Sequence, residues 1–209
     1  MIQLFLKAKH WQLFILLFGS PMLVQGVFIT SMFSTILGDG EPDIDRIFGI
    51  MKFMPIVMSV ILLIYFAWFW SLGIGLNRLL PDTLKQKTGL FRLALVFPIM
   101  YIIFFLGFIG YMFVSLTSEM ASVNSGIIFF ILPLHLLAMA SMIYTLYFLA
   151  KTFKTAELRK EVSFSDFIGE FFMFWFYPIG VWFLQPKVNK MLEEGIIEDS
   201  LDEPSEFVD

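Results

Sequence analysis

Four long stretches without a formal charge constrain the fold of this 209-residue chain more than any other feature. Short polar connections separate them, and they cover residues 11–38, 53–77, 93–118 and 120–150. An α-helix rises about 1.5 Å per residue, so roughly 20 apolar residues cross a hydrocarbon core of about 30 Å. Each stretch exceeds that length. The sequence therefore predicts an all-α integral membrane helical bundle with four transmembrane helices, over residues 12–37, 53–77, 93–117 and 127–150.

The composition leaves no room for a separate soluble domain. Hydrophobic residues make up 58% of the chain and the mean hydropathy is +0.82, against roughly 45–50% apolar residues in soluble domains. Spans and short loops use up residues 1–192, which we interpret as one membrane domain. The last seventeen residues, 193–209, carry eight acidic side chains. We expect this tail to be disordered and the rest of the chain to be net positive.

Basic residues lie mainly on one side of the predicted spans. If the four helices cross in succession, only Arg46 and Lys52 fall on the side opposite the N-terminus. Cytoplasmic loops of membrane proteins carry an excess of Lys and Arg. The sequence therefore predicts a multi-pass membrane protein with a cytoplasmic N-terminus. The ten basic residues on that side are Lys7, Lys9, Arg78, Lys85, Lys87, Arg92, Lys151, Lys154, Arg159 and Lys160.

A fifth hydrophobic segment, residues 167–186, is shorter and more aromatic than the four spans. Its uncharged core of sixteen residues would reach only about 24 Å as one helix, and Pro178 and Gly180 lie near its middle. Proline removes a backbone donor and clashes with the preceding turn, so two short helices are easier to build than one crossing. A hairpin also keeps Lys187 and Lys190 with the other basic residues. We predict a re-entrant or interfacial segment packed on the bundle; a fifth crossing is the alternative.

His135 is the one side chain within the four stretches whose charge can change near neutral pH. Ionisable groups inside a bilayer are costly and often line ion or proton paths. The structural alternative is a neutral imidazole that is hydrogen-bonded to a neighbouring helix, for example to Gln25 or Ser59. We favour the structural role, because a proton relay needs a second titratable group at similar depth.

Two acidic residues complete the set of candidate functional polar side chains. Asp166 and Glu170 lie at the start of the fifth segment, close in sequence to four basic residues. We expect ion pairs for them at the membrane interface. Ser163 or Ser165 can cap a helix that begins here, and the helix dipole favours Asp166 in the first turn.

Familiar catalytic patterns are missing from the sequence. It contains no cysteine and only two histidines, and it has no HExxH, GxSxG or GxxxxGK[ST] pattern. We assign no catalytic, cofactor-binding or metal-binding residue, and we expect no enzyme activity. The basic loops are typical of the inner face of a membrane protein, so they do not indicate nucleic-acid binding.

Small residues on one helix face indicate where neighbouring spans pack closely. In this chain we expect such packing at Gly19 and Gly26, at Gly107 and Gly110, and at Ala138, Ser141 and Thr145.

Two stretches of the sequence carry a resemblance to a known group. They read ELRKEVSFSDFIGEFFMFWFYPIGVWFLQPKVNK at residues 157–190 and KAKHWQLFILLFG at residues 7–19. Together they resemble uncharacterised small multi-spanning inner-membrane proteins of Bacteroidota. The resemblance implies a bacterial inner membrane and carries no activity, so no functional residue is transferred from it.

Three functions remain open for such a chain. We favour a non-enzymatic accessory or interaction subunit that contacts the lipid bilayer and a protein partner, because the acidic tail is suited to recruiting a basic partner. A small-solute or ion transporter or channel subunit is the alternative. It is motivated by His135, by the proline inside each hydrophobic segment and by the broken fifth segment, and it requires a homo-oligomer. A membrane enzyme is the least supported.

Overall fold

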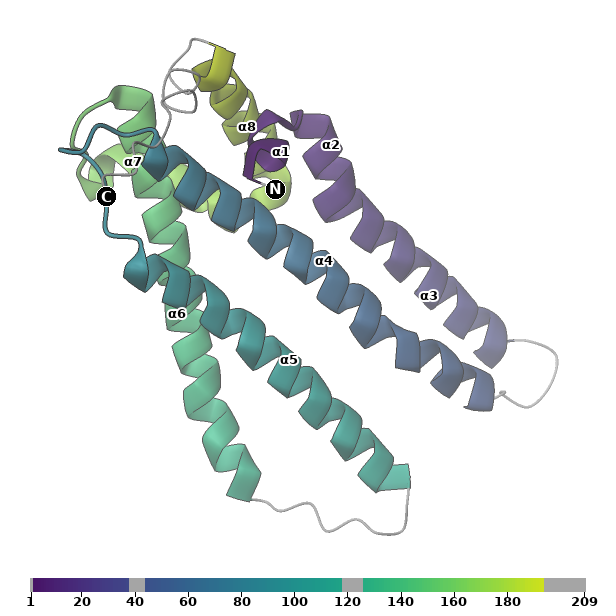
Figure 1. The fold of residues 1–209 in the computed structure, drawn as a ribbon. Coiled ribbons are helices and arrows are strands. Elements are labelled where there is room, and N and C mark those ends of the chain that lie inside the picture. The colour runs from purple at the N-terminus through teal and green to yellow at the C-terminus, as the bar shows by residue number, and fades with distance from the viewer. Residues whose placement is uncertain (1, 38–43, 118–125, 194–209) are drawn as a thin grey trace, which may run out of the picture.

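The computed structural model of the chain describes residues 2–37, 44–117 and 126–193, and the regular structure in these ranges is helical. The predicted all-α class is confirmed. The acidic tail lies outside the described residues, apart from Glu193. In chain order the elements (Figure 1) are α1 (Ile2–Lys7), α2 (His10–Phe14), the π-helical turn η1 (Ile15–Gly19), α3 (Ser20–Ile36), α4 (Ile44–Arg78), α5 (Gly89–Thr117), α6 (Gly126–Leu158), α7 (Phe164–Trp175) and α8 (Tyr177–Glu193).

Four helical segments are long and apolar enough to cross a membrane, as the sequence predicts. They make the chain a membrane protein. The first consists of α2, η1 and α3, which follow one another without a break. The four segments are His10–Ile36, Ile56–Arg78, Gly89–Met112 and Phe129–Leu158.

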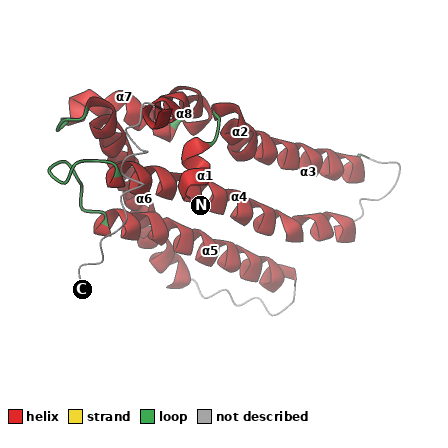
Figure 2. Ribbon diagram, turned by 45° about the horizontal axis from the view of Figure 1, so that its top comes forward, coloured by secondary structure: helices red, strands yellow, loops and turns green. Residues whose placement is uncertain are grey.

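The spans form two antiparallel pairs, α3 with α4 and α5 with α6 (Figures 1 and 2). At one end of the molecule lie α1, the loop of residues 79–88, the loop of residues 159–163, and helices α7 and α8. We call this end the basic end. The C-terminal ends of α3 and α5 and the N-terminal ends of α4 and α6 point the other way.

The hydrophobic core is concentrated at the basic end. Between 11% and 33% of the most apolar window of each span is buried within the chain. In the halves remote from the basic end, side chains such as Val27 and Phe129 are 68% and 81% exposed, which is the surface expected to face lipid. The largest fully buried side chains are Trp68, Phe69, Phe91, Phe153, Phe167, Phe174, Leu13, Leu17, Leu72, Leu76, Leu149 and Leu184.

The fifth hydrophobic segment forms two helices, as the sequence predicts. Helix α7 has 12 residues and α8 has 17, and α8 ends in a polar stretch, so neither supplies the roughly 20 apolar residues of a crossing. The chain turns at Phe176, not at Pro178 and Gly180. Pro178 is the second residue of α8, in the first turn, where its missing N–H has no helical acceptor to lose. Gly180 instead permits close packing, because a Cβ there would overlap the Met173 carbonyl in α7.

The α7–α8 hairpin packs on the bundle at the basic end, with α7 against α6 and α8 against α1 and α2. The Tyr177 hydroxyl donates a 3.1 Å hydrogen bond to the Leu17 carbonyl of η1. Pro21 lies four residues after Leu17 and has no backbone N–H to donate to this carbonyl, which leaves the carbonyl available. The outer face of the hairpin is aromatic and suited to contact with lipid; its exposed side chains include Phe172, Trp175, Phe176, Trp182 and Phe183.

Predicted packing at three of the seven small residues is wrong within this chain. A Cβ built at Gly26, Gly107 or Gly110 would meet no atom within 4 Å. These glycines are not at helix contacts, because the spans diverge away from the basic end. Close approach occurs instead at Gly73, which faces the Phe91 ring, and at Gly75, which faces Leu6 of α1.

On α6 the predicted packing is confirmed at Ala138 and Thr145. Ala138 is 7% exposed and Thr145 is fully buried. The Thr145 hydroxyl donates to the Ser141 carbonyl one turn earlier, so the stripe packs without an unpaired hydroxyl at Thr145.

Candidate functional site

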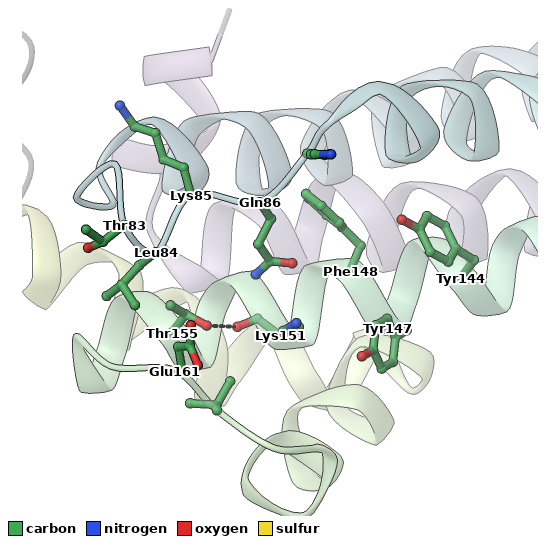
Figure 3. Close-up of a pocket in the computed structure, with 12 residues that line it drawn as sticks. Thr83, Leu84, Lys85, Gln86, Tyr144, Tyr147, Phe148, Lys151, Thr155 and Glu161 are labelled. Atoms are coloured by element: carbon green, nitrogen blue, oxygen red, sulfur yellow. Dashed lines mark hydrogen bonds between the residues drawn. The ribbon is translucent and has the colours of Figure 1, made fainter.

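A cavity of about 470 Å³ opens at the basic end between the 79–88 loop, α6 and the 159–163 loop (Figure 3). We call it the basic cavity. Its size lies within the range of about 300–1,000 Å³ that small-ligand sites occupy. The lining residues are Thr83, Leu84, Lys85, Gln86, Lys87, Tyr144, Tyr147, Phe148, Lys151, Thr155, Glu161 and Val162.

Gln86 is held in place by a polar bridge to α4. Its backbone N–H donates to Asn77 Oδ1 at 2.9 Å, and its carbonyl accepts from Asn77 Nδ2 at 3.0 Å. The side chain reaches from the loop toward α6 (Figure 3). Its Nε2 is buried and has no hydrogen-bond partner in the described part of the chain. A buried donor of this kind costs about 1–3 kcal/mol unless an acceptor meets it.

The charge of the basic cavity comes mainly from two lysines. Lys85 is paired with Asp82 at 2.8 Å and points away from α6 (Figure 3). Lys87 and Lys151 form no ion pair with any described residue. Glu161 is the one acid in the lining. The cavity therefore offers an anion two unpaired ammonium groups and hydroxyls, and the buried Gln86 amide reaches such an anion once its side chain turns into the cavity.

Glu170 belongs to an ion network that joins the three last helices. Its Oε1 lies 2.9 Å from Lys154 Nζ of α6 and 3.9 Å from Lys187 Nζ of α8. Glu157 lies 2.7 Å from both lysine ammoniums. Glu170 is only 7% exposed, so this network fixes the hairpin to α6. The predicted ion pair at Glu170 is present, and Lys187 is an unforeseen member.

Asp166 caps the start of α7. Its Oδ2 accepts a 2.8 Å bond from the Ser163 backbone N–H and a 2.7 Å bond from the Ser163 hydroxyl. These bonds hold the pKa of Asp166 below its ordinary value. The predicted place in the first helical turn is confirmed. The expected ion pair at Asp166 is wrong, because no described Lys or Arg lies within 4 Å of its carboxylate.

Gln185 is a buried polar residue that sequence reasoning missed. Its Nε2 lies 3.0 Å from the carbonyl oxygens of Phe5 and Leu6 and 2.8 Å from that of Ala8. The last four carbonyls of a helix have no helical hydrogen-bond partners. The Gln185 amide shares its two N–H groups among these three carbonyl oxygens and thereby caps α1. The only hint in the sequence is an amide inside an aromatic run.

His135 lies on an exposed face of α6. Its Nδ1 is 3.1 Å from the hydroxyl of Tyr101 in α5, and the two rings are 5.6 Å apart. The prediction of a hydrogen bond to a neighbouring helix is correct, but the suggested partners, Gln25 and Ser59, are wrong. Tyr101 could have been found as the polar side chain in the middle of the adjacent span.

Comparison with known protein families, with curated proteins and with solved structures finds no match for this chain. Among the described residues, no group of three His, Asp or Glu side chains could hold a metal ion. The three polar residues singled out from sequence do not form one site. Glu170 and Asp166 are on α7, His135 is on α6, and none of them lines the basic cavity.

The basic cavity itself was not predicted, although its parts are visible in the sequence. Lys85 and Lys87 belong to a basic loop, and Tyr144, Tyr147 and Lys151 follow one another at one-turn spacing near the end of a span. The pairing of that loop with α6 depends on how the second and fourth spans pack, which the sequence pattern does not specify.

Proposed function

We propose that this chain is a non-enzymatic subunit of a bacterial inner membrane that assembles laterally with a membrane-spanning helix of another polypeptide. The basic end faces the cytoplasm in this proposal. The excess of basic residues at that end supports the orientation, and the resemblance of residues 157–190 to inner-membrane proteins supports the compartment.

The exposed position of His135 carries the proposal of lateral assembly. When the Tyr101 hydroxyl donates to Nδ1, the neutral imidazole has its proton on Nε2, and this second nitrogen has no hydrogen bond to a described residue. Lipid tails offer no acceptor, so polar groups inside a membrane turn toward protein or a wet cavity. A second helix with an acceptor at this depth satisfies the imidazole.

The surroundings of His135 are compatible with such a helix. Leu136 and Met139 on α6 are more than half exposed, and Gly107 and Gly110 of α5 have open space beyond their Cα atoms. Glu170 and Asp166 are engaged in contacts that hold the fold together, which supports a role other than catalysis for them.

Site-specific photo-crosslinking tests lateral assembly. A benzophenone residue at Leu136 should give a discrete protein adduct in native membranes. The matched control is a benzophenone residue at Leu23, an exposed position on α3. His135→Phe keeps a ring of similar size but removes the hydrogen bond. An interhelical bond in a membrane contributes about 1 kcal/mol, so adduct yield at limiting expression should fall about five-fold. Absence of an adduct at Leu136 would contradict the proposal.

A transporter subunit is the second candidate, and the Tyr101–His135 hydrogen bond is the observation that favours it. The bond gives His135 a polar neighbour in the middle of the adjacent span. Flux through proteoliposomes that depends on pH between 5 and 8, and that is lost in His135→Phe, would favour transport. The assembly proposal expects no such flux.

A further inference from the structure

The basic cavity lies where a lipid headgroup would meet the protein. Along α6 its lining begins with Tyr144, Tyr147 and Phe148, within the apolar span, and continues to Lys151 and Thr155 near the helix end. Tyr144 and Thr155 are eleven residues apart in the sequence, or about 16 Å along the helix. The cavity therefore changes from aromatic to basic across the interface region of a bilayer.

The polar groups that line this cavity are predominantly hydrogen-bond donors. Lys87 and Lys151 supply unpaired ammonium groups, Tyr147 and Thr83 supply hydroxyls, and the buried Gln86 Nε2 lacks an acceptor. The Thr155 hydroxyl is already used, since it donates to the Lys151 carbonyl at 2.8 Å (Figure 3). An occupant that satisfies this set brings several oxygen acceptors and a negative charge.

We propose that the basic cavity binds a phosphate ester group, delivered by an anionic phospholipid from the leaflet that meets the basic end. Phosphate oxygens accept from lysine ammonium and amide donors, and basic pockets between transmembrane helices on the cytoplasmic side are suited to anionic headgroups. The aromatic half of the cavity lies beside the acyl chains. This arrangement favours a lipid over a soluble phosphate ester.

The Gln86 contact makes the cavity more selective than basic charge alone. Asn77 fixes the backbone of Gln86 on both sides, so only the side-chain torsions of Gln86 must change for its buried amide to meet a ligand. Glu161 lies in the 159–163 loop, and its charge opposes an anion placed at the cytoplasmic end of the cavity. The phosphate group is therefore expected near Gln86 and Lys151 rather than near Glu161.

Native mass spectrometry of the full chain in a neutral detergent tests this site, because headgroup binding needs no lateral partner. Phosphatidylglycerol should bind more tightly than phosphatidylcholine. Lys151→Gln should weaken phosphatidylglycerol binding about five-fold, since each basic residue near an anionic headgroup contributes about 1 kcal/mol. Gln86→Met, which keeps the side-chain length but removes the donor, should weaken it as well.

The control is Lys7→Gln, which removes the same charge from an exposed basic-end lysine outside the cavity. Its affinity should match that of the wild type. Equal binding of the two lipids, or equal effects of Lys7→Gln and Lys151→Gln, would overturn the site. Glycerol 3-phosphate serves as the soluble phosphate ester and should not displace the lipid. If glycerol 3-phosphate binds in the absence of lipid, and Lys151→Gln reduces its affinity, the phosphate site is confirmed. The proposal that a membrane lipid delivers the phosphate group is then overturned.

Discussion

At the scale of single residues, Glu170 has the most consequential contacts of the polar side chains singled out from sequence. It is nearly buried and lies between the ammonium groups of Lys154 and Lys187. Replacing one partner of a buried ion pair leaves the other without full compensation. Glu170 should therefore be sensitive even to an isosteric substitution.

Glu170→Gln should lower the free energy of unfolding by about 1–3 kcal/mol, because a neutral amide cannot replace a charge-assisted hydrogen bond. Equilibrium unfolding of the detergent-solubilised chain measures the change. Glu161→Gln, on an exposed loop residue without an ion pair among the described residues, is the control and should change stability by less than about 0.5 kcal/mol. Equal effects of both substitutions would contradict the role of Glu170.

The Asp166 cap should give stability a pH dependence with a defined sign. Its pKa lies below the ordinary value of 3.8, since Ser163 donates two hydrogen bonds to the carboxylate. The stabilisation is therefore complete above that ordinary value and is lost as pH falls through the lowered pKa. The unfolding midpoint of the wild type should exceed that of Asp166→Ala at pH 6, and the difference should shrink as the pH falls below about 4. A difference that stays constant with pH would contradict the cap.

Residue-level prediction from sequence succeeds where the partners are close along the chain. Ser163 and Asp166 are three residues apart, so the capping pattern is readable directly. It fails for Gln185, whose acceptors in α1 lie almost the whole chain away. That contact depends on the docking of α8 beside α1, and nothing in local spacing indicates it.

At the scale of elements, short α1 is held to the bundle by side chains from other helices. Six residues are too few for a stable isolated helix in water. Phe5 and Leu6 are buried against the core, and the Gln185 amide caps the carbonyl end. Loss of that amide should release α1 without unfolding the four spans.

Gln185→Met should raise the rate of amide hydrogen exchange in residues 2–9, because the buried carbonyls of α1 lose their donor at a cost of about 1–3 kcal/mol. Hydrogen exchange with mass spectrometry measures it. Gln25→Met, on the exposed face of α3, serves as the control. If both variants exchange like the wild type, the capping role is wrong.

Element ends differ from the predicted spans for a simple reason. The uncharged stretches report the hydrocarbon thickness, whereas a helix continues into water as long as its backbone bonds are satisfied. Thus α4 begins at Ile44, nine residues before the predicted span, and α6 continues to Leu158 rather than ending at 150. In α6 the extension carries Lys154 and Glu157, the residues that fix the hairpin.

At the scale of the whole molecule, the four spans share one packed end and diverge toward the other. The basic end contains the N-terminus, the 79–88 loop, the basic cavity and the α7–α8 hairpin. The proposed lipid site depends on all of these parts lying on one side of the membrane. The side is proposed to be the cytoplasm.

Single-cysteine labelling tests this arrangement most directly, because the native chain has no cysteine. The sites are Thr83 and Glu193 at the basic end and Asn124 in the connection between α5 and α6. A membrane-impermeant maleimide should label Asn124→Cys on intact cells and should label the other two variants only after permeabilisation. Labelling of Glu193→Cys together with Asn124→Cys on intact cells would contradict the account, since the hairpin would then cross the bilayer.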